Sequence, residues 1–280
     1  MQGRVIKLIS NKWTVLIGDK LLECSCIGKF KYLKKSPLVG DLVCVDVDNR
    51  IINNIMPRRN ELVRPPIANV DQALILTSCT EPSFSSNLLD KMLVIIEYNN
   101  IEPIICFTKY DLLKDTTYID GIINYYRKIG YKVFINNDLD TIKKTLKGKV
   151  SVLTGQTGVG KSSLLNHLKE DLNLSTSEIS KALGRGKHTT RHVELLEIEN
   201  ALVADTPGFS SIDFIGMNKN DIKDNFKEFY ENQEKCKYKD CMHIKEDGCH
   251  IKKLCNENII LNTRYENYKK FIEQIEKDKR

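Results

Sequence analysis

Hydrophobic residues follow two different patterns along the chain, and the change comes near residue 68. Up to about residue 60, the apolar residues fall in the short runs RVIKLIS, KWTVLIG, KLLECSCIG and DLVCVDV, which Asn, Gly, Asp and Pro separate. Runs of this length, rich in β-branched residues, indicate β-strands. Five or so short strands without a long helix predict a small β-barrel, which we place at residues 1–62.

Beyond residue 68 the pattern becomes one of continuous apolar runs that alternate with helical segments. The runs ALILTSC (73–79) and PIICFT (103–108) have the composition of parallel strands covered on both faces. Helices are predicted at 85–99, 118–129 and 140–148, and further strands at 131–136, 149–155 and within 197–208. This alternation predicts an α/β domain with a parallel sheet, at residues 63–216.

Two shorter regions flank the predicted α/β domain. The segment RRNELVRPPI (58–67) is expected to be a linker, because Pro65 and Pro66 cannot continue a strand or a helix. From residue 219 onward the sequence is helical and charged, and a cluster of cysteines interrupts it. This predicts a small α-helical C-terminal domain at residues 217–280.

Composition excludes several classes of protein. Of the 280 residues, 41% are hydrophobic and 29% are charged, which excludes a collagen-like or a wholly disordered chain. No apolar run approaches the roughly 18 residues that cross a bilayer, and MQGRVIKLIS lacks the apolar stretch of a secretion signal. We therefore expect a cytoplasmic protein that does not bind membranes. Nothing in the sequence demands an oligomer, so a monomer is expected.

Positive charge is concentrated at the N-terminus. The net charge is +6, and residues 1–66 hold 12 Lys and Arg against 6 Asp and Glu, so the rest of the chain is neutral. One loop-like stretch combines basic and aromatic side chains: Lys29, Phe30, Lys31, Tyr32, Lys34 and Lys35. Because basic groups contact phosphates and aromatic rings stack on bases, this mixture favours an RNA-binding barrel of the OB type. A lysine-rich solvated surface would have the same charge.

The strongest chemical signal is a glycine-rich loop between an apolar strand and a helix. The segment Gly155-Gln156-Thr157-Gly158-Val159-Gly160-Lys161-Ser162, followed by Ser163, matches the pattern G-x-x-x-x-G-K-[ST]. Glycines let such a loop curl so that its backbone N–H groups point at phosphate oxygens, and the helix N-terminus adds partial positive charge. We expect Lys161 to reach the β- and γ-phosphates of a nucleotide and Ser162 to ligate Mg²⁺.

A second phosphate-sensing element follows about 45 residues later. In Asp205-Thr-Pro-Gly208, which follows the strand ALVA, the carboxylate is expected to hold Mg²⁺, usually through water, and the Gly208 amide to sense the γ-phosphate. The intervening segment GRGKHTTRH (184–192) stands where a switch loop is expected, and either Thr189 or Thr190 would close on Mg²⁺ and the γ-phosphate. A flexible basic loop would fit this segment equally well.

The third element is Thr108-Lys109-Tyr110-Asp111, at the end of the strand PIICFT. A carboxylate here can accept hydrogen bonds from N1–H and the exocyclic amine of guanine, a donor pair that adenine lacks. The stem of Lys109 would lie along the base, and Thr108 stands where such motifs usually have Asn. Asp111 precedes Gly155 by 44 residues, the reverse of the usual order in GTPases. Circular permutation of the domain explains this order, since it is tolerated where termini lie close together at the surface.

Four of the nine cysteines crowd into twenty residues near the C-terminus. The others, Cys24, Cys26, Cys44, Cys79 and Cys106, are scattered in apolar surroundings and are expected to be small core residues. The set Cys236, Cys241, His243 and Cys249 offers three thiolates and one imidazole, which fit tetrahedral Zn²⁺ in a closed structural site, one per chain. His250 and Cys255 are spare candidates.

Taken together, these residues resemble the family of ribosome small subunit-dependent GTPase A, also called RsgA or YjeQ. The resemblance covers essentially the whole chain and rests on the order TKYD, GQTGVGKSSLLN, GRGKHTTRH and DTPGF, followed by CKYKDCMHIKEDGC. It implies an N-terminal OB fold, a circularly permuted GTPase domain and a C-terminal zinc-binding domain. It also implies GTP hydrolysis in late maturation of the small ribosomal subunit, with rRNA binding and stimulation by that subunit.

The residue after Gly208 leaves other interpretations open. Phe209 stands where Ras-like enzymes have the glutamine that orients water, so the catalytic group must come from elsewhere. His188 in the expected switch loop is our candidate, because a histidine can orient water or transfer protons. The chain could instead be an RNA-binding assembly scaffold with a vestigial nucleotide site. A third possibility is an ATP-dependent enzyme in which TKYD is a chance match.

Overall fold

The computed structural model describes residues 1–28, 30, 36–136, 138–168, 193–198, 200–205 and 213–278. The chain divides into two compact units, each built from two separate stretches of sequence. The first unit consists of Met1–Leu76 and Asn136–Ser210, and the second of Thr77–Ile135 and Ser211–Arg280. Strand β8 (Gln72–Ser78) runs from the first unit into the second.

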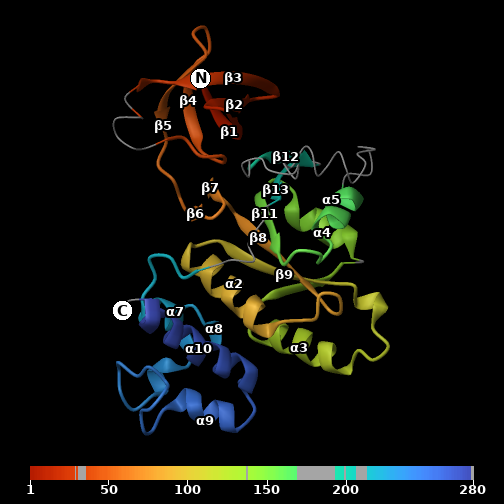
Figure 1. The fold of residues 1–280 in the computed structure, drawn as a ribbon, viewed down its shortest axis with the longest axis vertical. Helices are drawn as coiled ribbons and strands as arrows, with labels where there is room; N and C mark the ends of the chain where they lie inside the picture. Colours follow the sequence, from red (N-terminus) through yellow and green to blue (C-terminus); the bar gives the residue numbers. More distant parts are fainter. Residues whose placement is uncertain are drawn as a thin grey trace. The chain divides into compact units, whose positions relative to one another are not determined.

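The N-terminal part of the first unit is a closed five-stranded barrel (Figure 1). Its strands are β1 (Gln2–Ile9), β2 (Lys12–Ile17), β3 (Lys20–Cys26), β4 (Leu42–Asp46) and β5 (Ile51–Ile55), in the order β1-β2-β3-β5-β4. Alternate residues such as Val5, Val15 and Val43 point inward and are fully buried, as the period of a strand requires. This confirms the predicted barrel.

The stretch of basic and aromatic residues that was expected to contact RNA is described only at Phe30. The Phe30 side chain is buried, so its ring is not available to stack on a base. The other residues of the stretch lie outside the described residues: Lys29, Lys31, Tyr32, Lys34 and Lys35.

The segment that was expected to be a linker forms a small sheet instead. Strands β6 (Glu61–Val63) and β7 (Pro66–Ala68) pair in antiparallel fashion, so the linker prediction was wrong. Pro66 is the first residue of its strand, a position that tolerates proline. Ile67 is fully buried, and the Ala68 N–H donates to the Val39 carbonyl at 2.9 Å.

The rest of the first unit is built around buried parallel strands. Strand β11 (Val150–Gly155) lies between β8 and β13 (Ala201–Asp205) and is parallel to both, while β12 (Leu195–Ile198) is antiparallel to β13. Helices α4 (Leu139–Leu146) and α5 (Lys161–Leu168) belong to this unit. The barrel contacts it where Lys7 on β1 makes a 2.9 Å ion pair with Glu194, just before β12.

The second unit begins with two parallel strands and two helices. Strand β9 (Glu102–Thr108) pairs with β10 (Lys132–Ile135). Helix α2 (Ser86–Tyr98) packs on β9, and helix α3 (Thr117–Lys128) packs on β10. Ser85 caps the N-terminus of helix α2, because its side chain accepts a hydrogen bond from the Leu88 N–H. The helix buries its apolar residues from Leu89 to Ile96. These elements match the predicted segments.

The C-terminal part of the second unit is helical, as predicted. It contains α7 (Lys219–Asp224), α8 (Lys227–Tyr230), the short helix η2 (Gln233–Lys235), α9 (His250–Asn256) and α10 (Asn262–Asp278). Phe226, Phe229, Tyr268 and Phe271 form an aromatic core whose ring centroids are 5.0 to 6.2 Å apart. Helix α10 packs against α2 (Figure 1). The helices within the described ranges include none long and apolar enough to span a membrane.

Candidate functional site

The glycine-rich loop connects strand β11 to helix α5 in the first unit. Strand β11 ends at Gly155 and helix α5 begins at Lys161, so the motif has the strand–loop–helix context that the sequence predicted. Gly155 has a φ of 142°, and a Cβ there would lie 2.3 Å from the carbonyl oxygen of Leu76. A side chain would therefore collide with the neighbouring strand, and only glycine lets the chain leave β11 at this angle.

Lys161 places a cation inside the loop. Its side chain is only 8% exposed, and its ammonium donates to the carbonyl oxygens of Gly155 at 2.7 Å and Gln156 at 2.9 Å. The next residue, Ser162, is half-buried in the first turn of α5, whereas Ser163 is exposed. A lysine cation and a helix N-terminus at one loop are the two features that bind the phosphates of a nucleotide.

The other phosphate-site residues are described only in part. Asp205 is the last residue of β13, where its backbone is aligned with Leu153 of the parallel strand β11. The carboxyl ends of these two strands therefore lie at the same edge of the sheet, although the Asp205 side chain is outside the described part of the chain. The remaining predicted residues, His188, Thr189, Thr190 and Gly208, lie outside the described residues.

The motif Thr108–Asp111 lies at the carboxyl end of β9 in the second unit. Thr108 is buried, and its hydroxyl donates to the Thr77 carbonyl at 3.4 Å. Lys109 has a φ of 58°, which turns the chain into the short helix η1 (Tyr110–Leu112), and its ammonium donates to the Glu81 carbonyl. Asp111 is exposed at this turn. Its carboxylate can therefore accept hydrogen bonds from a ligand.

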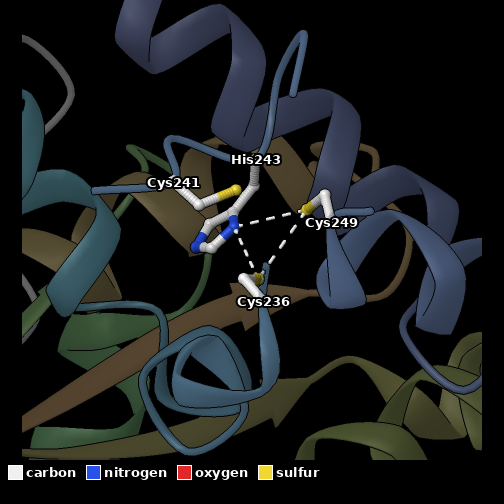
Figure 2. Close-up of side chains that lie close together, drawn as sticks. All are labelled: Cys236, Cys241, His243 and Cys249. Atoms are coloured by element: carbon white, nitrogen blue, oxygen red, sulfur yellow. Dashed lines mark hydrogen bonds between the residues drawn. The ribbon is translucent and has the colours of Figure 1, made fainter. Parts of the chain in front are cut away.

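Four ligand atoms come together at the C-terminal cysteine cluster. Those of Cys236, Cys241, His243 and Cys249 all lie within 4.8 Å of one another (Figure 2). The Nδ1 atom of His243 is 3.6 Å from the Cys236 sulfur and 3.4 Å from the Cys249 sulfur, and these two sulfurs are 4.0 Å apart. With metal–sulfur bonds of about 2.3 Å, a tetrahedral ion separates its ligand atoms by about 3.5–3.8 Å. The cluster therefore fits a metal ion, and it consists of the four predicted residues.

Burial sets the protonation of this cluster. Burial lowers the pKa of His243 to about 4, so the imidazole is neutral, as a metal ligand must be. Burial also raises the pKa of the Cys241 thiol to about 12. A thiolate at this position therefore needs a cation beside it, which a metal ion would supply.

Glu246 organises the loop that carries His243, a role that the sequence analysis missed. Its carboxylate accepts the backbone N–H groups of Met242 at 2.8 Å, Ile244 at 2.8 Å and Lys245 at 3.0 Å. Tyr265 on α10 also holds this loop, because its hydroxyl donates to the His243 carbonyl at 2.7 Å. Glu246 is visible in the sequence as the glutamate of KEDGC, next to the predicted ligands. Its backbone partners could not be predicted, because they come together only when the loop has folded.

Comparisons with known families match most of the chain. The RsgA GTPase family matches residues 55–215, and the RsgA N-terminal domain matches residues 2–52. A protein of Bacillus cereus named small ribosomal subunit biogenesis GTPase RsgA is 46% identical to this chain, covering 99% of it and 98% of the relative. A protein of the same name from Pediococcus pentosaceus is 44% identical, covering 99% of this chain and 94% of the relative.

Solved structures resemble the chain over its whole length. One is described as YloQ, a circularly permuted GTPase, and has a TM-score of 0.83 at 37% identity, covering 100% of this chain and 96% of that chain. Another is YjeQ from Thermotoga maritima, with a TM-score of 0.84 at 31% identity and coverage of 98% of both chains. The reversed order of the two nucleotide motifs thus has a counterpart in a known permuted fold.

Proposed function

The chain belongs to the RsgA family of GTPases, enzymes that hydrolyse GTP, and we propose that it acts in late maturation of the small ribosomal subunit. In this proposal it binds rRNA and GTP, and contact with the small subunit stimulates hydrolysis. The observation that carries the proposal is the glycine loop with Lys161 inside it, in a chain whose relatives are small ribosomal subunit biogenesis GTPases. Such assembly takes place in the cytoplasm, where we expect a monomer to act.

Each of the two motifs would bind a different part of the nucleotide. Backbone N–H groups of loop 155–160 and the Lys161 ammonium bind the phosphates, and Asp111 accepts from the guanine edge. Lys161 is well placed to balance negative charge on the β- and γ-phosphates because its ammonium already lies at the loop. Ser162 and Asp205 are the residues that would hold Mg²⁺, which neutralises phosphate charge when bound.

Hydrolysis needs a group that orients the attacking water. The phenyl ring of Phe209 cannot polarise water, so we propose His188 for this role. Thr189 or Thr190 would close on the γ-phosphate, together with the Gly208 amide. Release of the γ-phosphate would free this segment, so that binding to the small subunit depends on the nucleotide.

The barrel and the cysteine cluster serve binding and stability in this proposal. The positive charge of residues 1–66 would attract rRNA to the barrel. One Zn²⁺ per chain would bind Cys236, Cys241, His243 and Cys249, because three sulfurs and one imidazole are the ligands of structural zinc sites. The ion would hold together the segment between η2 and α9, which is charged and too short to form a core of its own.

GTP turnover with purified small subunits, with large subunits and with neither tests the proposed function. We expect slow turnover alone and a rise in turnover with small subunits only. Lys161→Ala should abolish the stimulated turnover, whereas Lys147→Ala, at an exposed lysine of the same unit, should retain it. Absence of turnover under all three conditions would favour a scaffold with a vestigial site. Equal competition by ATP and GTP would contradict guanine recognition.

A further inference from the structure

The aspartate that we propose to read guanine lies on a short turn with few backbone hydrogen bonds of its own. Asp111 lies in the three-residue helix η1, which follows the left-handed residue Lys109. Two long backbone hydrogen bonds close the turn, from Leu112 N–H to the Lys109 carbonyl and from Leu113 N–H to the Tyr110 carbonyl, both 3.2 Å. Two hydrogen bonds from one carboxylate to a base require both oxygens to meet strict distance and angle limits. A turn closed by two long bonds does not by itself hold the carboxylate in such an orientation.

One end of the turn is tied to the chain that leaves β8. The Cys79 N–H donates to the Thr108 carbonyl at 2.9 Å, and the Lys109 ammonium donates to the Glu81 carbonyl. These bonds hold the backbone before Asp111. They do not reach the residues that follow it.

The other tie is a side-chain hydrogen bond to helix α3. The Tyr110 hydroxyl donates to the Asp120 carboxylate at 2.7 Å. Asp120 lies in the first turn of α3, and its neighbours Ile119, Ile122 and Ile123 are buried under that helix. The helix therefore holds the Asp120 carboxylate in place. Its hydrogen bond to Tyr110 closes the segment 110–120, which contains Asp111.

We infer that Asp120 is a positioning residue for guanine recognition, acting through Tyr110 on the orientation of Asp111. This inference rests on the proposed function, which assigns the base to Asp111. The Asp120 carboxylate does not touch the nucleotide in this scheme. Its role is to hold the turn so that both Asp111 oxygens face the N1–H and 2-amino donors of guanine together.

Hypoxanthine provides a readout that separates positioning from general stability. The base of IDP lacks the 2-amino group of guanine, so the preference for GDP over IDP measures the second hydrogen bond to Asp111. A misdirected carboxylate loses that second bond first, which lowers the preference. A variant that is merely less stable binds both nucleotides with the same ratio as the wild type.

The experiment measures competition of GDP and IDP against a fluorescent GDP analogue on the full chain. We expect Tyr110→Phe and Asp120→Ala each to lower the preference for GDP about three- to tenfold. The double variant should be no worse than Tyr110→Phe alone, because Tyr110→Phe already removes the bond to Asp120, together with the hydroxyl's contact to Thr116. Asp120→Asn, which keeps an acceptor oxygen, should restore part of the preference. Tyr118→Phe is the matched control, since Tyr118 lies on the same helix and is 62% exposed.

Steady-state turnover adds a second, independent measurement. Base recognition holds the ground state and the transition state equally, so the KM for GTP should rise in Asp120→Ala while kcat is unchanged. An equal fall in kcat for GTP and ITP without a change in KM would contradict positioning of the base.

Asp111→Asn distinguishes failure of the inference from failure of the proposed function. If Asp111→Asn leaves the preference for GDP over IDP unchanged, guanine is not read at this aspartate and the proposed function is wrong on this point. If Asp111→Asn abolishes the preference while Tyr110→Phe and Asp120→Ala retain it, the inference about Asp120 is overturned. Lower unfolding midpoints with an unchanged preference would likewise assign the bond a structural role only.

Discussion

Arg264 is the most deeply buried cation among the described residues of the second unit, and its removal gives the sharpest test of how that unit is held together. Its side chain is 1% exposed. One guanidinium nitrogen donates to Asp90 at 2.7 Å, and two others donate to Glu228 at 2.7 and 2.8 Å. The guanidinium also lies 4.5 Å from the ring centre of Phe226. One cation thus joins α2, α8 and α10.

Replacing Arg264 with methionine keeps most of the buried volume but leaves two carboxylates without their cation. Breaking a buried ion pair by removing one partner costs about 3–5 kcal/mol. We therefore expect Arg264→Met to lower the free energy of unfolding by about 4 kcal/mol at pH 7. Arg127→Met, at an exposed arginine on α3 with one bond to the Val133 carbonyl, should cost less than about 1 kcal/mol.

The loss should depend on pH in a defined direction. Burial raises the pKa of Asp90 above its ordinary value even with Arg264 beside it. A carboxyl group whose pKa is raised by folding stabilises the fold most below its unfolded pKa, and this contribution is lost as pH rises through the folded pKa. Without Arg264 the pKa of Asp90 should rise further. The deficit of Arg264→Met should therefore be larger at pH 7 than at pH 4.

Urea unfolding at both pH values, followed by circular dichroism, measures this loss. The slope of the free energy against urea should be unchanged, so that the midpoint reports stability. Adding Asp90→Asn and Glu228→Gln to Arg264→Met should recover part of the loss, because both remaining groups are then neutral. A loss below about 1 kcal/mol at pH 7, or a loss independent of pH, would refute the assignment of the stability to this charge cluster.

Three further predictions concern other sites. Gly155→Ala should abolish GTP binding in a fluorescent nucleotide titration, because its Cβ would lie 2.3 Å from the Leu76 carbonyl oxygen; wild-type affinity would contradict the loop geometry. Cys249→Ser should reduce the metal content of the purified protein from about one ion per chain, as elemental analysis would show; an unchanged content would remove Cys249 from the ligand set. Arg58→Met should lower stability by about 2 kcal/mol, measured by urea unfolding, since it leaves the fully buried Asp41 without the cation 2.8 Å away.

Local signals predicted most of the secondary structure. The continuous apolar run at 73–79 became β8, and the run at 103–108 became β9, because strands buried on both faces need no polar positions. The segment 85–99 became α2, whose Ser85 cap is readable in the sequence. The four metal ligands were predictable for a similar reason, since the donor types and their spacing lie within fourteen residues.

Contacts between distant segments were not predictable from spacing. Nothing near Asp90 indicates that its partner is Arg264, and nothing in TKYD indicates that Tyr110 bonds to Asp120 on the following helix. The strand β7 was missed because the proline rule was applied without regard to position in the strand. In each case the deciding interaction arises only when the chain has folded.

The joining of α2, α8 and α10 by one arginine also has a consequence for biosynthesis. Arg264 is translated 174 residues after Asp90, so α2 emerges from the ribosome long before its buried partner exists. Folding of this unit therefore cannot finish during most of elongation, unlike that of a domain that is contiguous in sequence. A chain cut short before α10 would lack the cation that Asp90 and Glu228 share, so we expect this unit of the truncated product to stay unfolded and open to proteolysis.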